Sequence, residues 1–176
     1  MTSFFARMSG AALLNATVYE EVEADRTATV QAAAVVALSS LAAGFGAVGP
    51  RLSIGTILTF ALLAFLVWAT WAVLTLQIGM RLLPTPGTEA DTGQLLRTIG
   101  FATAPGIARI AAVIPGARSF VFAVTAVWML MAMLVAVRQA LDYTSTLRAL
   151  AVCFVGWFLA VAMAIAIGVL FSPTLQ

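Results

Sequence analysis

Four long stretches of this chain contain no charged residue: 27–48, 54–80, 119–137 and 149–171. Each has about 20 residues or more, which is the length that an α-helix needs to cross the ~30 Å apolar core of a bilayer. Only 9% of all residues are charged, whereas water-soluble domains carry about a quarter. These charges are too few to cover a water-facing surface. The sequence therefore predicts an all-α, polytopic helical bundle that is integral to a membrane.

A fifth apolar stretch, 94–115, carries Arg97 and Arg109 and has Pro105 near its centre. Its apolar part is long enough to cross the bilayer, and both arginines can extend to opposite interfaces. Pro105 has no backbone N–H and interrupts a helix, and neighbouring helices shield such breaks in membranes. We expect this third span inside the bundle, broken at Pro105. The five predicted transmembrane helices are therefore about 27–48, 54–80, 95–114, 119–137 and 149–171.

The distribution of arginine predicts the orientation of the chain, because short cytoplasmic loops carry an excess of basic residues. A re-entrant stretch 94–115 would leave four spans, and both topologies place six arginines inside, three outside and the N-terminus in the cytoplasm. Charge therefore does not decide between them. With five spans the C-terminus is outside, and the arginines divide into Arg7, Arg26, Arg81, Arg97, Arg138 and Arg148 inside and Arg51, Arg109 and Arg118 outside.

Residues 1–26 are expected to form a cytoplasmic N-terminal region before the membrane domain, 27–176. Apolar residues at helical spacing predict a short amphipathic helix over 2–14, either in the headgroup layer or packed on the bundle. Thr17 and Glu20 fit a capping box for a second helix that starts near Val18 and continues into the membrane. An acidic cluster occupies its opening turns, where the helix dipole favours negative charge. The cluster consists of Glu20, Glu21, Glu23 and Asp25.

Small residues recur at every fourth position in the last apolar stretch, which places them on one face of a helix. Such a ridge lets helix backbones approach closely in membranes. The predicted helix-contact ridge consists of Gly156, Ala160, Ala164 and Gly168. In the fourth stretch, Ser119 is the expected N-cap.

The side chains offer little for catalysis. The chain has no His, and its one cysteine, Cys153, lies in an apolar run. The usual metal sites need several such ligands, and His is the commonest general base. The seven acids lie outside the apolar core. We therefore expect no enzyme activity and no cofactor or metal, and the scattered arginines form no nucleic-acid-binding patch.

The stretch Gly100-Phe101-Ala102-Thr103-Ala104-Pro105 resembles the Gly-Tyr-x-x-x-Pro motif of the Yip1 family, with Phe101 in the place of Tyr. The segments 19–25, 87–91 and 138–143 also fit, so the chain resembles a compact prokaryotic-type member over nearly its whole length. The resemblance implies five spans, a cytosolic N-terminus and the inner membrane of a prokaryotic cell. It implies no enzymatic activity. Eukaryotic relatives contact Rab-type GTPases through longer N-terminal regions, so GTPase binding is not expected here.

The leading hypothesis is a non-catalytic membrane protein that organises the bilayer or assembles with other membrane proteins or with itself. The second is a small transporter, channel or lipid-moving protein that uses the broken third span, since broken helices often line pathways. An enzyme is the least favoured class, because no acid lies within an apolar stretch.

Overall fold

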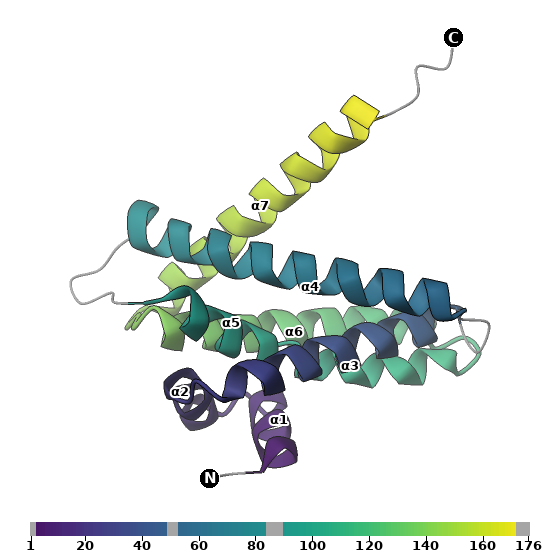
Figure 1. Cartoon of the computed structure of the whole chain (residues 1–176), viewed down its shortest axis with the longest axis horizontal. Coiled ribbons are helices and arrows are strands. Elements are labelled where there is room, and N and C mark those ends of the chain that lie inside the picture. Colours follow the sequence, from purple (N-terminus) through teal and green to yellow (C-terminus); the bar gives the residue numbers. More distant parts are fainter. Residues whose placement is uncertain (1–2, 49–52, 84–89, 172–176) are drawn as a thin grey trace.

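The computed structural model describes residues 3–48, 53–83 and 90–171, and every regular element in them is helical (Figure 1). The described residues contain no strand, as the sequence predicts. The elements in chain order are α1 (Phe4–Ala12), α2 (Ala16–Ala24), α3 (Ala28–Val48), α4 (Ile54–Gln77), the π-helical turn η2 (Ile78–Leu82), α5 (Thr92–Phe101), the 3₁₀-helix η3 (Ala104–Val113), α6 (Arg118–Ala140) and α7 (Thr146–Phe171).

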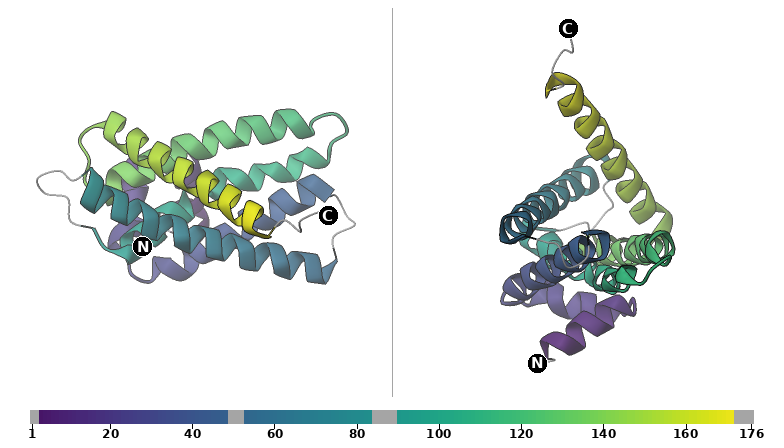
Figure 2. Two further views of the ribbon diagram at one scale, coloured as in Figure 1. Left: turned by 90° about the horizontal axis from the view of Figure 1, so that it is seen from above. Right: turned by 90° about the vertical axis from the view of Figure 1, so that its right-hand side faces the viewer.

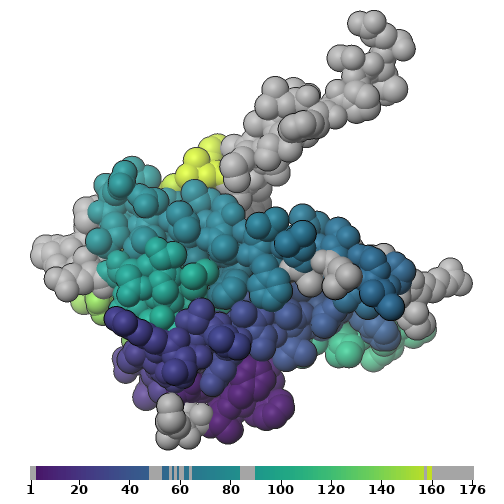
Figure 3. Space-filling view, viewed as in Figure 1, coloured from purple at the N-terminus to yellow at the C-terminus, as the bar shows by residue number. Residues whose placement is uncertain are grey.

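The long elements lie side by side along one axis of the molecule (Figure 1, Figure 2). α3, α4, the pair α5–η3 and α6 follow one another in alternating directions, and η3 packs between α3 and α6. α7 starts at the end of the bundle where α6 finishes and then leaves it at an angle (Figure 1). α1 and α2 lie on one side of the bundle, across its long axis, and project from that side (Figure 3).

Three stretches in the described part of the chain are long and apolar enough to cross a bilayer: Ala28–Ala47, Phe65–Leu82 and Arg118–Ala140. A shorter apolar stretch, Thr146–Gly156, lies in α7. The long stretches correspond to the first, second and fourth predicted spans. The length and apolar composition of these helices therefore indicate a helical membrane protein.

Large apolar side chains point outward along these helices, which is the pattern expected where lipid is the solvent. On α4 and α6, the exposed ones include Ile54, Leu62, Leu63, Leu66, Val67, Val73, Phe120, Val124, Val127, Leu130 and Met131. Small residues such as Ala72, Ala132 and Ala136 are buried instead. These small buried side chains let the helices lie close together where they meet.

The predicted third span consists of two helices rather than one α-helix broken at Pro105. α5 ends at Phe101, and the 3₁₀-helix η3 starts at Ala104, with Pro105 in its first turn. The residue before a proline disfavours the α conformation, so the break precedes the proline itself. At about 1.5 Å per residue in α5 and about 2 Å in η3, the pair reaches roughly 35 Å. The ribbon runs from one end of the bundle to the other over this length and does not turn back (Figure 1).

A ten-residue 3₁₀-helix is unusual, because such helices rarely exceed about four residues. Here the backbone of α3 lies directly against it. A Cβ atom added to Gly46 would lie 2.2 Å from the carbonyl oxygen of Arg109, and one added to Gly106 would lie 2.1 Å from Ser39 Oγ. A Cβ added to Gly100 would lie 2.7 Å from Ala32 Cβ. Ala32, Ser39 and Gly46 are spaced by seven residues, so one face of α3 contacts both α5 and η3.

The N-terminal helices differ from the sequence prediction in their caps. Asn15, not Thr17, is the N-cap of α2, and its side chain accepts a hydrogen bond of 3.1 Å from the Thr17 N–H. The second helix also does not continue into the membrane. It ends at Ala24, and the Asp25 side chain accepts bonds from the backbone and hydroxyl of Thr27 just before α3 starts. This turn separates α2 from α3.

Asp91 is the N-cap of α5. Its carboxylate accepts the Gln94 N–H at 2.9 Å, and the Gln94 side chain accepts the Asp91 N–H at 2.7 Å, which completes a capping box. The prediction for Ser119 is wrong, since α6 starts at Arg118 and its N-cap is Ala117.

Replacing Asp91 with alanine is expected to lower the free energy of unfolding by about 1 kcal/mol, because the Gln94 N–H loses its acceptor at an exposed helix end. Thermal unfolding of the detergent-solubilised protein measures this loss. Asp91→Asn retains an acceptor and is expected to recover most of it, so equal losses in the two variants would contradict the capping role.

Candidate functional site

Arg97 fastens α2 to the bundle. The arginine is 6% exposed and comes from α5. Its Nε lies 3.0 Å from the carbonyl oxygens of Val22 and Glu23, and its Nη2 also donates to the Glu23 carbonyl. The last carbonyls of a helix have no partner within that helix and carry the negative end of its dipole. Arg97 therefore caps the C-terminus of α2, a contact that the sequence did not indicate, and its expected place near a membrane interface stays a prediction.

The acidic cluster is the second part of this attachment, because each of its four carboxylates bonds to another element. Glu21 and Asp25 each lie 2.8 Å from Arg7 Nη2 of α1, in an ion pair with an arginine that is 3% exposed. Gln94 of α5 donates to Glu23 at 3.1 Å, and Gln139 of α6 donates to Glu20 at 2.8 Å. We call Arg97, Arg7 and these four acids the N-terminal anchor. It joins α1, α2, α5 and α6.

The carboxylates of the anchor have different proton affinities. Burial raises the pKa of Glu23 to about 7, and repulsion from Asp142 adds to this effect while Arg97 opposes it. Hydrogen bonds from Thr27 and Arg7 lower the pKa of Asp25 to about 2. Near neutral pH, Glu23 therefore changes charge.

The stability of the anchor is expected to depend on pH through Glu23. A folded-state pKa of about 7 against an ordinary value of 4.5 means that the folded state binds the proton more tightly than the unfolded state. The contribution is therefore fully present below about pH 4.5 and is lost as the pH rises through about 7. Melting temperatures at pH 5 and pH 8 measure it. Glu23→Gln should flatten this part of the profile, and an unchanged slope would contradict the assignment.

The residues of the Gly-Phe-x-x-x-Pro motif form a packing contact. Phe101 is fully buried in a cluster with Tyr19 and Val22 of α2 and Ala32 of α3. Gly100 meets Ala32, and Pro105 is buried at the start of η3. Tyr19 donates its hydroxyl to the Ala11 carbonyl at 3.1 Å. The motif thus lies where α5, α3 and the N-terminal helices meet.

Arg109 lies in η3, some distance from the motif, and its side chain turns toward α6. Its Nε lies 3.2 Å from Thr125 Oγ1, and its guanidinium carbon is 5.3 Å from the centre of the Phe122 ring. Thr125 is buried two turns into α6, so the guanidinium packs against that helix, and its expected place at a membrane interface stays a prediction. No carboxylate pairs with Arg109 among the described residues.

The predicted ridge on α7 is described only at its first member. A Cβ on Gly156 would lie 3.3 Å from the Trp71 ring of α4, so Gly156 allows α7 to pass close to that tryptophan. The side chains of Ala160, Ala164 and Gly168 lie outside the described residues.

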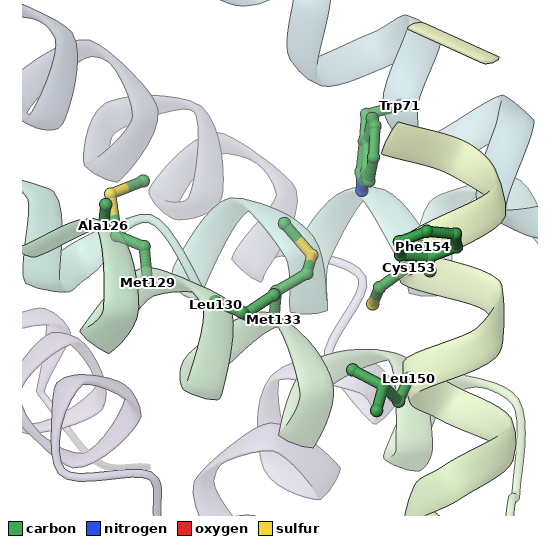
Figure 4. A pocket seen from close by; sticks show the side chains of 8 residues that line it. All are labelled: Trp71, Ala126, Met129, Leu130, Met133, Leu150, Cys153 and Phe154. Atoms are coloured by element: carbon green, nitrogen blue, oxygen red, sulfur yellow. The ribbon is translucent and has the colours of Figure 1, made fainter. Parts of the chain in front are cut away.

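A cleft between α4 and α6 is a feature that the sequence did not indicate. Its outer part, toward α7, is a cavity of about 430 Å³ lined by apolar side chains that include Leu130, Leu150 and Phe154 (Figure 4). A second, adjacent cavity of about 320 Å³ lies against α3 and η3 and includes Ser39, Thr103 and Arg109; we call it the inner part. Trp71, Met129 and Met133 line both parts. We call the two together the α4–α6 cleft.

Trp71 contributes a polar atom without a partner to this cleft. Trp68 donates its indole N–H to the Leu96 carbonyl at 3.0 Å, and Trp128 donates to the Ala12 carbonyl at 2.6 Å. The Nε1 atom of Trp71 is buried and has no hydrogen-bond partner in the described part of the chain. In Figure 4 the ring of Trp71 points this nitrogen into the cavity. Trp68 and Trp71 are three residues apart, so they lie one helical turn apart on α4.

The described residues include no group of three or more Cys, Asp or Glu placed to hold a metal ion. Compared with protein-family models, with curated proteins and with solved structures, the chain matches none. Its class therefore follows from the fold and the outward apolar surface: it is an all-helical membrane protein with an N-terminal anchor and a cleft between α4 and α6.

Proposed function

We propose that this chain is a non-catalytic integral membrane protein with five spans, which organises the membrane or assembles with other membrane proteins or a second copy of itself. The observation that carries the proposal is the path of α7, which leaves the bundle and keeps large apolar side chains exposed (Figure 1). Leu147 is 74% exposed, Phe154 64% and Phe158 61%. A membrane helix placed apart from its own bundle offers a face to a partner.

The orientation in this proposal has the N-terminus in the cytoplasm of a prokaryotic cell, at its inner membrane. It is supported by the position of the arginines along the elements. Arg26, Arg81, Arg138 and Arg148 belong to the end of the bundle where α3 and α7 start, and Arg7 and Arg97 bond to α2 near it. Arg109 and Arg118 follow the crossing by α5–η3 toward the other end. The excess of arginine at the first end is the feature expected of a cytoplasmic side.

We also propose that the chain is a Yip1-type protein, and the support for this is the motif of Gly100, Phe101 and Pro105. These three residues occupy the contact between α5, α3 and the N-terminal helices, so the motif has a defined structural role here. That role is packing rather than chemistry, which agrees with a protein that acts through assembly.

Cross-linking in native membranes, followed by native mass spectrometry of the full chain in lipid nanodiscs, tests assembly. We expect an oligomer or a complex, and Ala164→Leu with Gly168→Leu should reduce it because larger side chains separate the predicted ridge from its partner. Leu62→Ala on the exposed face of α4 is the matched control. A protein that stays monomeric and without partners in both measurements would contradict the proposal.

A lipid-moving protein is the alternative, and the α4–α6 cleft favours it because the cleft adjoins the unusual 3₁₀-helix η3. A lipid-scrambling assay in liposomes tests this function. If the protein moves lipids, we expect lipid transfer above that of empty liposomes, and Ala126→Phe, which narrows the cleft, should reduce this transfer. Transfer equal to that of empty liposomes would contradict this function.

A further inference from the structure

We propose that the α4–α6 cleft binds an anionic amphiphile, with the negative group at Arg109 and the apolar chain in the outer part of the cleft. This site goes beyond the assembly function, and neither depends on the other. The ligand class is a single acyl chain ending in a carboxylate, or an acyl chain of an anionic phospholipid, since both carry the same chemistry.

The charge of Arg109 indicates the sign of the ligand. A guanidinium within a membrane bundle is costly unless it is paired, and such residues commonly mark binding sites or pathways. Thr125 and Phe122 supply one hydroxyl and one ring face, which leaves the positive charge without an anion among the described residues. Arginine donates through several N–H groups in a planar fork that fits carboxylate and phosphate. Arg109 therefore has the donors for an anionic group in the inner cleft.

The shape and lining of the cleft indicate the apolar part of the ligand. Each part of the cleft has the volume of a small-molecule site, about 430 Å³ and about 320 Å³. The outer part is lined by Leu130, Leu150 and Phe154, all exposed at the surface between α6 and α7 (Figure 4). This surface faces lipid in a membrane, so an acyl chain can enter from the bilayer.

The unpartnered Trp71 N–H favours a ligand that carries a hydrogen-bond acceptor over a plain hydrocarbon chain. A buried donor without an acceptor costs free energy, and the Trp71 side chain lines both parts of the cleft. An ester or carboxyl oxygen near the head of an amphiphile supplies this acceptor. Arg109 and Trp71 together thus require a ligand with oxygen atoms at one end and hydrocarbon at the other.

Tryptophan fluorescence quenching by brominated lipids tests the site, because Trp68 and Trp71 line the inner cleft. The full chain is reconstituted in phosphatidylcholine nanodiscs and titrated with dibromostearate, with brominated phosphatidylglycerol and with brominated phosphatidylcholine. We expect saturable quenching by at least one of the two anionic probes at mole fractions where the neutral probe quenches little. The more effective anionic probe identifies the source of the ligand. Equal quenching by all three, or quenching without saturation, overturns the proposal.

Variants assign the quenching to the cleft. Arg109→Gln is expected to weaken binding of the anionic probe by about tenfold or more, because a charge-assisted hydrogen bond is lost. Ala126→Phe fills the outer cavity without changing Arg109 and should also weaken it, which keeps the test valid if the arginine variant does not fold. Ala123→Phe, on the exposed surface of the same helix and outside the cleft lining, is the matched control. Binding unchanged in Ala126→Phe overturns the proposal.

Discussion

Replacing Arg97 with methionine is expected to detach α2 from the bundle and to lower the free energy of unfolding by about 2–4 kcal/mol. The methionine keeps much of the aliphatic volume but donates no hydrogen bond, so the carbonyls of Val22 and Glu23 lose their partner in a buried place. The variant removes a positive charge and adds none, so the expected loss of stability comes from the missing hydrogen bonds and not from charge repulsion. The two measurements are the melting temperature and the rate of proteolysis between α2 and α3.

Arg118→Met is the control for this prediction. Arg118 is exposed at the start of α6, where the helix dipole disfavours a positive charge, so its removal is expected to leave stability nearly unchanged. Equal melting temperatures for the Arg97 and Arg118 variants would show that Arg97 does not hold α2 in place.

Gly46→Ala is expected to be the most damaging small substitution in the chain. The new Cβ would lie 2.2 Å from the Arg109 carbonyl oxygen, a backbone atom that no side-chain rotation can move. α3 and η3 must therefore separate, which costs about 2–3 kcal/mol and lowers the melting temperature by roughly 5–10 °C. The proposed crossing by α5–η3 depends on this contact, so the variant should also express poorly in membranes.

Gly55→Ala is the matched control, because it is the same change in another long helix. The nearest atom to the new Cβ is Ser53 Oγ at 3.8 Å, which is an ordinary contact. Alanine is a better helix former than glycine by about 0.5–1 kcal/mol. Gly55→Ala should therefore leave stability equal or slightly higher, and a Gly46→Ala protein as stable as this control would contradict the close packing of α3 on η3.

The helical class and the apolar spans were predictable from the sequence, because long charge-free stretches have few solutions other than membrane helices. The interruption near Pro105 was also predictable, since proline lacks the N–H that an α-helix needs. The 3₁₀ geometry of η3 was not. It accompanies the close approach of α3 at Gly46 and Ser39, and a tertiary contact of this kind leaves no local pattern in residues 104–113.

The acids and arginines show the same limit more clearly. Their sequence positions suggested a helix N-terminus for the acidic cluster and interfaces for Arg97 and Arg109. In the structure Glu20 bonds Gln139, across most of the chain, and Arg97 bonds the end of α2. The partners of a charge in a membrane protein are set by which helices pack together. Spacing along the chain does not reveal that arrangement.

We propose that α5 and η3 together carry the chain across the bilayer, so that α5 starts on the cytoplasmic side and α6 starts on the outside. Single cysteines at Ser119 and Thr144, in a Cys153→Ala background, test it by labelling with a membrane-impermeant maleimide in intact cells and in inverted vesicles. We expect Ser119→Cys to be labelled from outside only and Thr144→Cys from the cytoplasmic side only. Labelling with the sides reversed, Ser119→Cys from the cytoplasmic side only and Thr144→Cys from outside only, would contradict the crossing and support a re-entrant stretch.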